Sequence, residues 1–153
     1  MKKYYLAYGS NLNVEQMGWR CPDARVLGTA KIAGYRLLFK GSKTGSYLTI
    51  EAQDGAYVPV AVWEVSKTDE EKLDRYEGYP NFYYKKEVLI EYTGIKSGRK
   101  RRVKAFVYIM HEDRKLGLPS KMYLETCLRG YYSFGFDEKY LRQALNDSRE
   151  VVE

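Results

Sequence analysis

Apolar segments with the spacing of β-strands dominate the first two thirds of the chain. They lie at residues 4–8, 26–39, 47–51, 58–65, 83–92 and 101–110. Gly9 ends the first segment, as is typical of a short buried strand. Gly28 and Gly34 interrupt the second segment, and we expect bulges or bends there. Glycines within residues 93–98 predict a hairpin turn between the last two strands.

Helical patterns are short and become more frequent toward the C-terminus. Asn11 or Asn13 can cap a helix over residues 14–19. A further helix is expected over residues 119–130, and Asp137 can cap a last one. We find no internal repeat and no linker, so we read the 153 residues as one domain. Strands followed by helices predict an α+β fold, a barrel-like or curved sheet with flanking helices.

The clearest local signal is the capping box Thr68-Asp69-Glu70-Glu71. Its first hydroxyl can accept the N3 amide of a helix, and its last carboxylate can reach back to the cap. The helix is expected to run to about Glu77, because Gly78 suits a left-handed residue after a helix and Pro80 prevents continuation.

Glu77 is the first candidate for chemistry. It shares a helix face with Leu73, the face expected to pack on the core. Burial raises the pKa of a carboxyl group, and the negative end of the helix dipole shifts that pKa in the same direction. Such a group suits general acid–base catalysis near neutral pH. The alternative is that Glu77 turns outward and pairs with Lys85 or Lys86.

The loop Tyr8-Gly9-Ser10-Asn11-Leu12, after the first strand, is the second candidate. Gly9 allows a close approach of backbone to ligand, and the amides that follow can form an anion-binding nest. Ser10 and Asn11 add side-chain donors. The loop therefore suits a carboxylate or a developing oxyanion, although the same residues also occur in ordinary turns.

Composition narrows the classes of function. Hydrophobic residues make up 44% of the chain, as in globular proteins. No apolar run reaches the roughly 18–20 residues that span a membrane, and the N-terminus lacks an apolar signal segment, so we expect a cytoplasmic protein. Cys21, Cys127 and His111 are too scattered for a conventional zinc site, and we expect no metal and no cofactor. A histidine-dependent nucleophile would have to use His111.

The net charge of +6 comes from one segment. Residues 96–104 hold six of the 26 basic side chains, and the remaining 20 equal the acidic residues in number. A basic hairpin tip is usually a solvated turn that keeps a strand edge from pairing. Phosphate binding at this tip is the alternative, but nucleic acid is not the partner that we expect.

The sequence resembles the γ-glutamylcyclotransferase family, which includes AIG2-like and γ-glutamylamine cyclotransferase relatives. Family members begin with a strand running into Tyr-Gly-Ser-Asn-Leu, which is intact here at Tyr8 to Leu12. Further similar segments follow in the same order at Pro22-Asp23-Ala24, Gly28-Thr29-Ala30, residues 34–39, residues 73–78, Tyr84, residues 119–123 and Gly130-Tyr131.

The resemblance implies a small mixed β-barrel with flanking helices, and a reaction that closes a γ-glutamyl group into 5-oxoproline with release of an amine or amino acid. It implies that Glu77 moves the proton and that residues 8–12 hold the substrate. By the same analogy Tyr84 and Tyr123 supply further hydrogen bonds. No metal or cofactor is required.

The aromatic segment 79–83, together with Tyr131 and Tyr132, is expected to wall the leaving-group side of the pocket. The expected partner is a small γ-glutamyl compound, and a homodimer is possible. A non-catalytic small-ligand binding protein on the same fold and a basic nucleic-acid-associated protein are the alternative functions.

Overall fold

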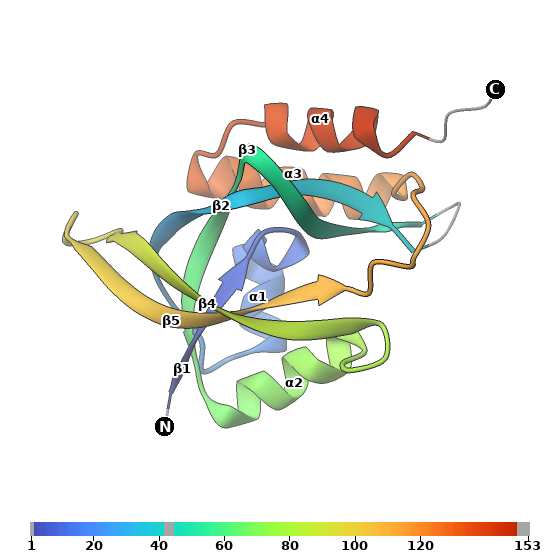
Figure 1. Cartoon of the computed structure of the whole chain (residues 1–153). Coiled ribbons are helices and arrows are strands. Elements are labelled where there is room, and N and C mark those ends of the chain that lie inside the picture. Colours follow the sequence, from blue (N-terminus) through green and yellow to red (C-terminus); the bar gives the residue numbers. More distant parts are fainter. Residues whose placement is uncertain (1, 42–44, 150–153) are drawn as a thin grey trace.

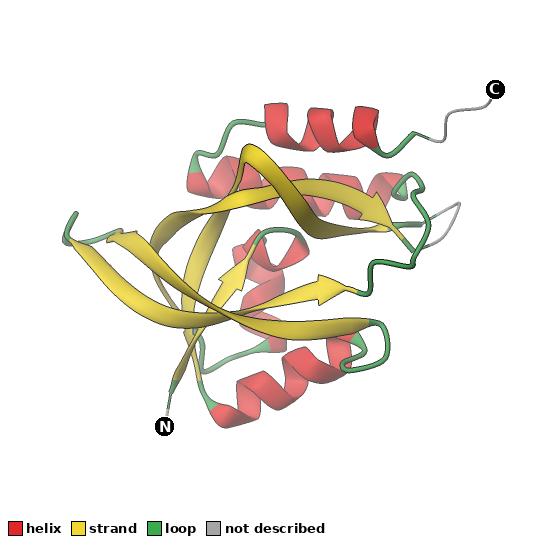
Figure 2. Cartoon of the chain, in the orientation of Figure 1, coloured by secondary structure: helices red, strands yellow, loops and turns green. Residues whose placement is uncertain are grey.

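The computed structural model describes residues 2–41 and 45–149, and within them a closed β-barrel carries flanking helices (Figures 1 and 2). The order of neighbouring strands around the barrel is β1-β3-β2-β4-β5. This architecture confirms the predicted α+β barrel. The strands are β1 Lys3–Ala7, β2 Arg25–Lys40, β3 Tyr47–Val65, β4 Tyr83–Gly94 and β5 Lys100–Met110.

The barrel closes through one parallel pair and one short antiparallel contact. Strand β1 pairs parallel with β5 and antiparallel with β3. On the other side β2 meets β4 at Gly28 and Thr29, opposite Gly94 and Thr93. A Cβ atom on Gly28 would lie 2.1 Å from the carbonyl oxygen of Thr93, so only glycine permits this approach. The predicted irregularities at Gly28 and Gly34 are confirmed as register shifts of β2 against β3.

The two strands expected at residues 47–51 and 58–65 are in fact one, and the prediction of a break was wrong. Both halves of β3 pair with the same long partner: Tyr35 of β2 faces Ala52, and Ala33 faces Tyr57. Pairing with β2 continues on both sides of this register shift, so residues 53–56 form an irregularity within one strand.

The short helix η1 (Ser10–Leu12) and α1 (Val14–Arg20) follow β1, and α2 (Lys67–Glu77) follows β3. Asn13 caps α1 by accepting the amide of Gln16 at 3.0 Å, as one of the two predicted caps. The capping box of α2 lies two residues earlier than predicted. The side chain of Ser66 accepts the amide of Asp69 at 3.1 Å, and the Asp69 carboxylate accepts the amide of Ser66, because Ser66 is the single residue between the end of β3 and the start of the helix. The left-handed Gly78, with φ of 66°, ends α2 as predicted.

The helices α3 (Lys121–Phe134) and α4 (Lys139–Asp147) complete the fold. The predicted end of α3 near Gly130 is wrong, because the helix continues to the left-handed Gly135. Gly130 serves a packing role instead: a Cβ there would lie 2.6 Å from Leu12, so its absence lets α3 rest on η1. The residue before α4 is Glu138 rather than Asp137, although the Asp137 carboxylate accepts the amide of Lys139 at 2.9 Å.

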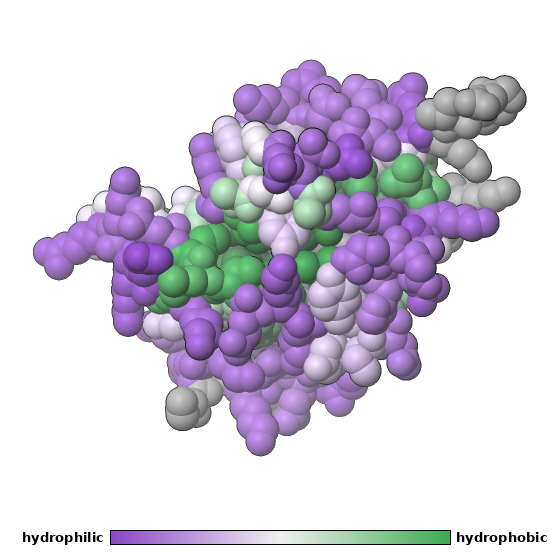
Figure 3. Space-filling model, viewed as in Figure 1, coloured by the Kyte–Doolittle hydropathy of each residue, from purple (hydrophilic) through white to green (hydrophobic). Residues whose placement is uncertain are grey.

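The predicted basic hairpin is confirmed as the turn between β4 and β5. It projects at the far left of the molecule in Figure 1. Hydrophilic residues cover most of the face seen in Figure 3, and apolar residues show in a strip beside this hairpin. None of the helices in the described ranges is both long enough and apolar enough to cross a membrane.

Candidate active site

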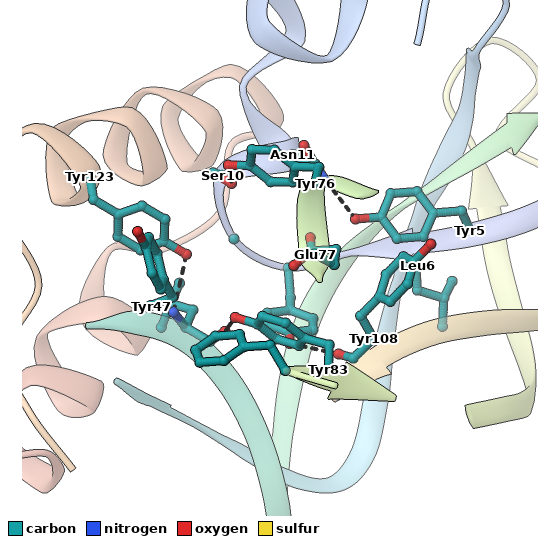
Figure 4. A pocket seen from close by; sticks show the side chains of 14 residues that line it. Tyr5, Leu6, Ser10, Asn11, Tyr47, Tyr76, Glu77, Tyr83, Tyr108 and Tyr123 are labelled. Atoms are coloured by element: carbon teal, nitrogen blue, oxygen red, sulfur yellow. Dashed lines mark hydrogen bonds between the residues drawn. The ribbon is translucent and has the colours of Figure 1, made fainter. Parts of the chain in front are cut away.

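A cavity of about 200 Å³ opens where the end of β1, η1, the end of α2 and α3 meet (Figure 4). Its walls are mostly aromatic, and Glu77 is the one carboxylic acid among the residues that line it. The lining residues are Tyr5, Leu6, Tyr8, Gly9, Ser10, Asn11, Tyr47, Leu48, Tyr76, Glu77, Phe82, Tyr83, Tyr108 and Tyr123.

Glu77 lies at the centre of this cavity, at the last position of α2 (Figure 4). Leu73, one turn earlier on the same face, is fully buried, as the sequence predicts. Burial raises the pKa of the Glu77 carboxyl group to about 8, and the positive charge of Arg20 opposes this shift only in part. At neutral pH both protonation states of Glu77 are therefore populated.

The alternative in which Glu77 pairs with a lysine does not occur. Lys85 binds Glu70 and Asp74, each at 2.9 Å, and Lys86 donates to the hydroxyl of Tyr35 at 2.7 Å. Within residues 2–41 and 45–149 Glu77 has no ion-pair partner. Its carboxyl group is thus left for a ligand.

Phenol groups surround Glu77. Burial raises the pKa of each of them above the ordinary value for tyrosine, and the charge of Glu77 adds to this effect. They therefore remain neutral across the physiological range and act as hydrogen-bonding groups. These residues are Tyr5, Tyr8, Tyr76, Tyr83, Tyr108 and Tyr123.

The structure brings four of the five predicted loop residues to the cavity. Tyr8, Gly9, Ser10 and Asn11 line it, while Leu12 is fully buried in the core. Ser10 shares a hydrogen bond of 2.9 Å with the hydroxyl of Tyr76. The amides of Leu12 and Asn13 donate back into the loop at 3.0 Å.

The backbone amides of Ser10 and Asn11 donate to no group in the described part of the chain. They remain as donors for a ligand at this side of the cavity. The anion-binding nest at these amides stays a prediction.

Tyr123 lies in the cavity wall as predicted, whereas Tyr84 does not. The hydroxyl of Tyr123 accepts the amide of Leu48 at 3.1 Å. The hydroxyl of Tyr84 points away and donates to Glu112 at 2.5 Å. Successive residues of a strand face opposite sides, so β4 turns Tyr83 to the cavity and Tyr84 outward. The placement of Tyr84 in the site is therefore corrected.

The expected aromatic wall is only partly present. Phe82 and Tyr83 line the cavity, but Tyr131 and Tyr132 lie along a separate groove between α1 and the end of α3. Tyr131 is buried in the core and Tyr132 is 89% exposed. Helix α3 lines the cavity only at its first turn, where Tyr123 lies. Tyr131 and Tyr132 lie more than two turns further along the helix.

Sequence reasoning missed four aromatic residues of the cavity and one cation behind it. Tyr5, Tyr47, Tyr76 and Tyr108 are spread over four elements, and only folding brings them together. The cation is Arg20, whose guanidinium lies over the ring of Tyr76. The one usable signal was the number of tyrosines, which is 16.

The remaining candidates lie outside the cavity. His111 contacts the carbonyl oxygen of Pro80 at 2.7 Å and does not line the cavity. In the described parts of the chain no three His, Cys, Asp or Glu residues gather closely enough to hold a metal ion. The basic residues Lys96, Arg99, Lys100 and Arg101 line a different groove beside the hairpin.

Comparison with known proteins gives a consistent assignment. A family model described as "Gamma-glutamyl cyclotransferase, AIG2-like" matches residues 5–125. The gamma-glutamylcyclotransferase of Homo sapiens is 28% identical over 144 residues, which cover 89% of this chain and 73% of that protein. The Bos taurus protein of the same name is 29% identical over 147 residues, or 91% of this chain and 75% of that protein.

Solved structures share the fold. One of a gamma-glutamyl cyclotransferase gives a TM-score of 0.79 at 24% identity, over 100% of this chain and 91% of that chain. The structure of a Homo sapiens protein described as uncharacterized gives a TM-score of 0.78 at 27% identity, over 99% of this chain and 94% of that chain. The small barrel with flanking helices is therefore the fold of these proteins.

Proposed function

The chain belongs to the gamma-glutamyl cyclotransferase, AIG2-like family, and from its site we propose that it converts a small γ-glutamyl compound into 5-oxoproline and a free amine or amino acid. The observation that carries this proposal is the unpaired carboxyl group of Glu77 at the centre of an aromatic cavity. A group that only binds a ligand gains nothing from this placement, since burial opposes its ionisation.

Glu77 matches the proton transfers that the reaction needs. The α-ammonium group of the substrate must lose a proton before its nitrogen attacks the γ-carbonyl carbon, and the Glu77 carboxylate takes it. The new carbon–nitrogen bond closes the five-membered ring. The bond to the leaving nitrogen then breaks as the same carboxyl group returns the proton to it. With a pKa of about 8, Glu77 is close in acidity to an α-amino group, so neither transfer is strongly uphill.

The loop and the phenols supply the rest of the chemistry. The amides of Ser10 and Asn11 suit the substrate carboxylate or the negative charge that develops on the γ-carbonyl oxygen. Nucleophile and electrophile belong to one molecule, so the main task of the protein is to hold the folded conformer. A cavity of about 200 Å³ suits this compact shape.

The test is release of 5-oxoproline from a panel of γ-glutamyl amino acids, γ-glutamyl peptides and γ-glutamyl amines. Glu77→Gln should remove nearly all turnover while the fold is kept, because an amide cannot carry the proton. Glu71→Gln is the matched control, since Glu71 lies exposed on the same helix and should keep full activity.

The outcomes separate the proposal from a binding role. Turnover that depends on Glu77 supports the cyclotransferase. Turnover that survives Glu77→Gln would remove Glu77 from its role. If no compound of the panel is converted, yet one binds equally well to the wild type and to Glu77→Gln, the protein is a ligand-binding relative.

A further inference from the structure

Arg20, the last residue of α1, reaches behind the cavity to the loop of η1. Its guanidinium donates to Oδ1 of Asn11 and lies 3.4 Å from the centre of the Tyr76 ring. A second nitrogen donates to Gln16 at 3.4 Å. A guanidinium group has donors and no acceptor. The side-chain oxygen of Asn11 must therefore face Arg20, and this contact fixes the orientation of the Asn11 amide.

The orientation of the Asn11 side-chain amide determines whether the Tyr5 hydroxyl donates or accepts. The nitrogen of Asn11 faces the hydroxyl of Tyr5 and donates to it at 2.8 Å. The Tyr5 oxygen is thus an acceptor in this bond, and its own proton must point elsewhere. In the described residues that proton has no acceptor. Tyr5 lines the cavity and its ring faces Glu77 across the open space (Figure 4).

Tyr5 differs in this respect from three neighbouring phenols. Tyr8 donates its proton to the carbonyl oxygen of Tyr108 at 2.7 Å, and Tyr83 donates to that of Leu48 at 2.7 Å. Tyr108 donates to the carboxylate of Asp74 at 2.6 Å. These three protons are already held by the protein. Burial keeps the pKa of Tyr5 well above its ordinary value, so its hydroxyl stays protonated while the cavity is in use.

We propose that Tyr5 is a catalytic hydrogen-bond donor whose proton is directed into the cavity by Arg20 and Asn11. Its acceptor is the γ-carbonyl oxygen of the substrate, which becomes negatively charged as the ring closes. Arg20 acts through Asn11 and is a positioning residue. We call the contacts from Arg20 to Asn11 and from Asn11 to Tyr5 the relay. This inference rests on the proposed cyclotransferase reaction for its substrate, but the contacts that orient Tyr5 do not depend on it.

Kinetics on the best substrate of the γ-glutamyl panel provide the first test. Tyr5→Phe should lower kcat about 100-fold with little change in KM, as expected for loss of a donor to an oxyanion. Asn11→Asp keeps the shape and the contact to Arg20, but an ionised carboxylate accepts the proton of Tyr5 and should cause a loss at least as large. Tyr4→Phe, on the opposite face of β1, is the control and should leave kcat unchanged.

A double-mutant cycle separates positioning from general damage. The kcat of each variant is measured at its own pH optimum, so that the effect of Arg20 on the pKa of Glu77 does not enter the comparison. As a single change Arg20→Met should lower kcat, yet it should add less than a further threefold loss in the Tyr5→Phe background, because both changes remove one donor. Fully multiplicative losses would overturn the relay. Equal kcat for the wild type and Tyr5→Phe would overturn the catalytic role of Tyr5.

A second readout does not require turnover. The side-chain amide resonances of Asn11, assigned by their disappearance in Asn11→Asp, should shift in Tyr5→Phe and in Arg20→Met but not in Tyr4→Phe. Unchanged resonances in both variants would show that the relay is absent, whatever the activity. If these resonances shift while the wild type converts no γ-glutamyl compound, the relay stands and the proposed reaction fails.

Discussion

The guanidinium of Arg20 lies over the ring of Tyr76, with 3.4 Å between its central carbon and the ring centroid. Tyr76 immediately precedes Glu77, so this contact brings a positive charge from α1 to the final turn of α2. The charge lowers the pKa of Glu77, whereas burial raises it and dominates. Arg20 thus limits the shift of the Glu77 pKa to about 8.

The activity should follow the ionisation of Glu77. We expect kcat/KM to rise with unit slope as pH increases toward an inflection near 8, because the base must be ionised in the free enzyme, and to fall again where the α-ammonium group of the free substrate loses its proton. The other titratable groups that face Glu77 are phenols from β1, α2, β4, β5 and α3, and these stay neutral in this range.

Arg20→Met should move this inflection upward by about one pH unit, because it removes the charge that favours the ionised form. The measurement is kcat/KM between pH 6 and 10 for both proteins. Arg142→Met, at an exposed pair with Glu138, is the control and should not move it. An inflection that stays in place or moves downward would contradict the electrostatic role of Arg20.

The same carboxyl group should make stability depend on pH. Below pH 4.5, Glu77 is protonated in the folded and the unfolded chain alike. Between pH 4.5 and about 8 the unfolded chain releases a proton that the folded chain retains, so stability falls as pH rises. Glu77→Gln should abolish this loss and be more stable than the wild type above pH 8 by roughly 1–3 kcal/mol, a value reduced for water in the cavity.

Denaturant unfolding at pH 4, 6 and 9 measures this difference. The two proteins should converge at pH 4 and diverge at pH 9. A Glu77→Gln protein that is less stable than the wild type at pH 9 would mean that the carboxylate is stabilised in the fold rather than strained.

The family resemblance assigned substrate hydrogen bonds to both Tyr123 and Tyr84, but removal of their hydroxyl groups should affect activity differently. Tyr123→Phe removes a hydroxyl from the cavity wall and its bond to Leu48, and kcat/KM should fall about tenfold. Tyr84→Phe removes a hydroxyl that binds Glu112 outside the cavity, and kcat/KM should stay within about twofold of the wild type. A larger loss for Tyr84→Phe than for Tyr123→Phe would reverse this assignment.

Two helical glycines offer a matched test of packing. Gly130→Ala would place a methyl group 2.6 Å from Leu12 and 2.9 Å from the amide nitrogen of Asn13, so η1 must move. We expect a loss of about 2–3 kcal/mol in unfolding free energy. Gly18→Ala meets nothing within 4 Å and should be neutral or stabilising by up to about 1 kcal/mol. Equal effects would show that α3 does not depend on this close approach.

The sequence by itself determined the features that depend on neighbouring residues. Asn13 as a cap, Gly78 as the end of α2 and the strand interruptions at Gly28 and Gly34 follow from local backbone preferences. The face shared by Leu73 and Glu77 follows from the helical repeat. The continuous Tyr-Gly-Ser-Asn-Leu loop at residues 8–12 indicated the family before the fold was known.

Tertiary structure decided which of the 16 tyrosines surround Glu77. Tyr5 and Tyr108 lie about a hundred residues apart and share a cavity only because β1 pairs parallel with β5. The choice of Tyr83 over Tyr84 depends on which side of β4 faces α2, and a one-residue change of register would exchange them. Arg20 acts at the site because α1 packs behind η1. Contacts between distant segments carry no local signal, so only the closed barrel could place these groups around Glu77.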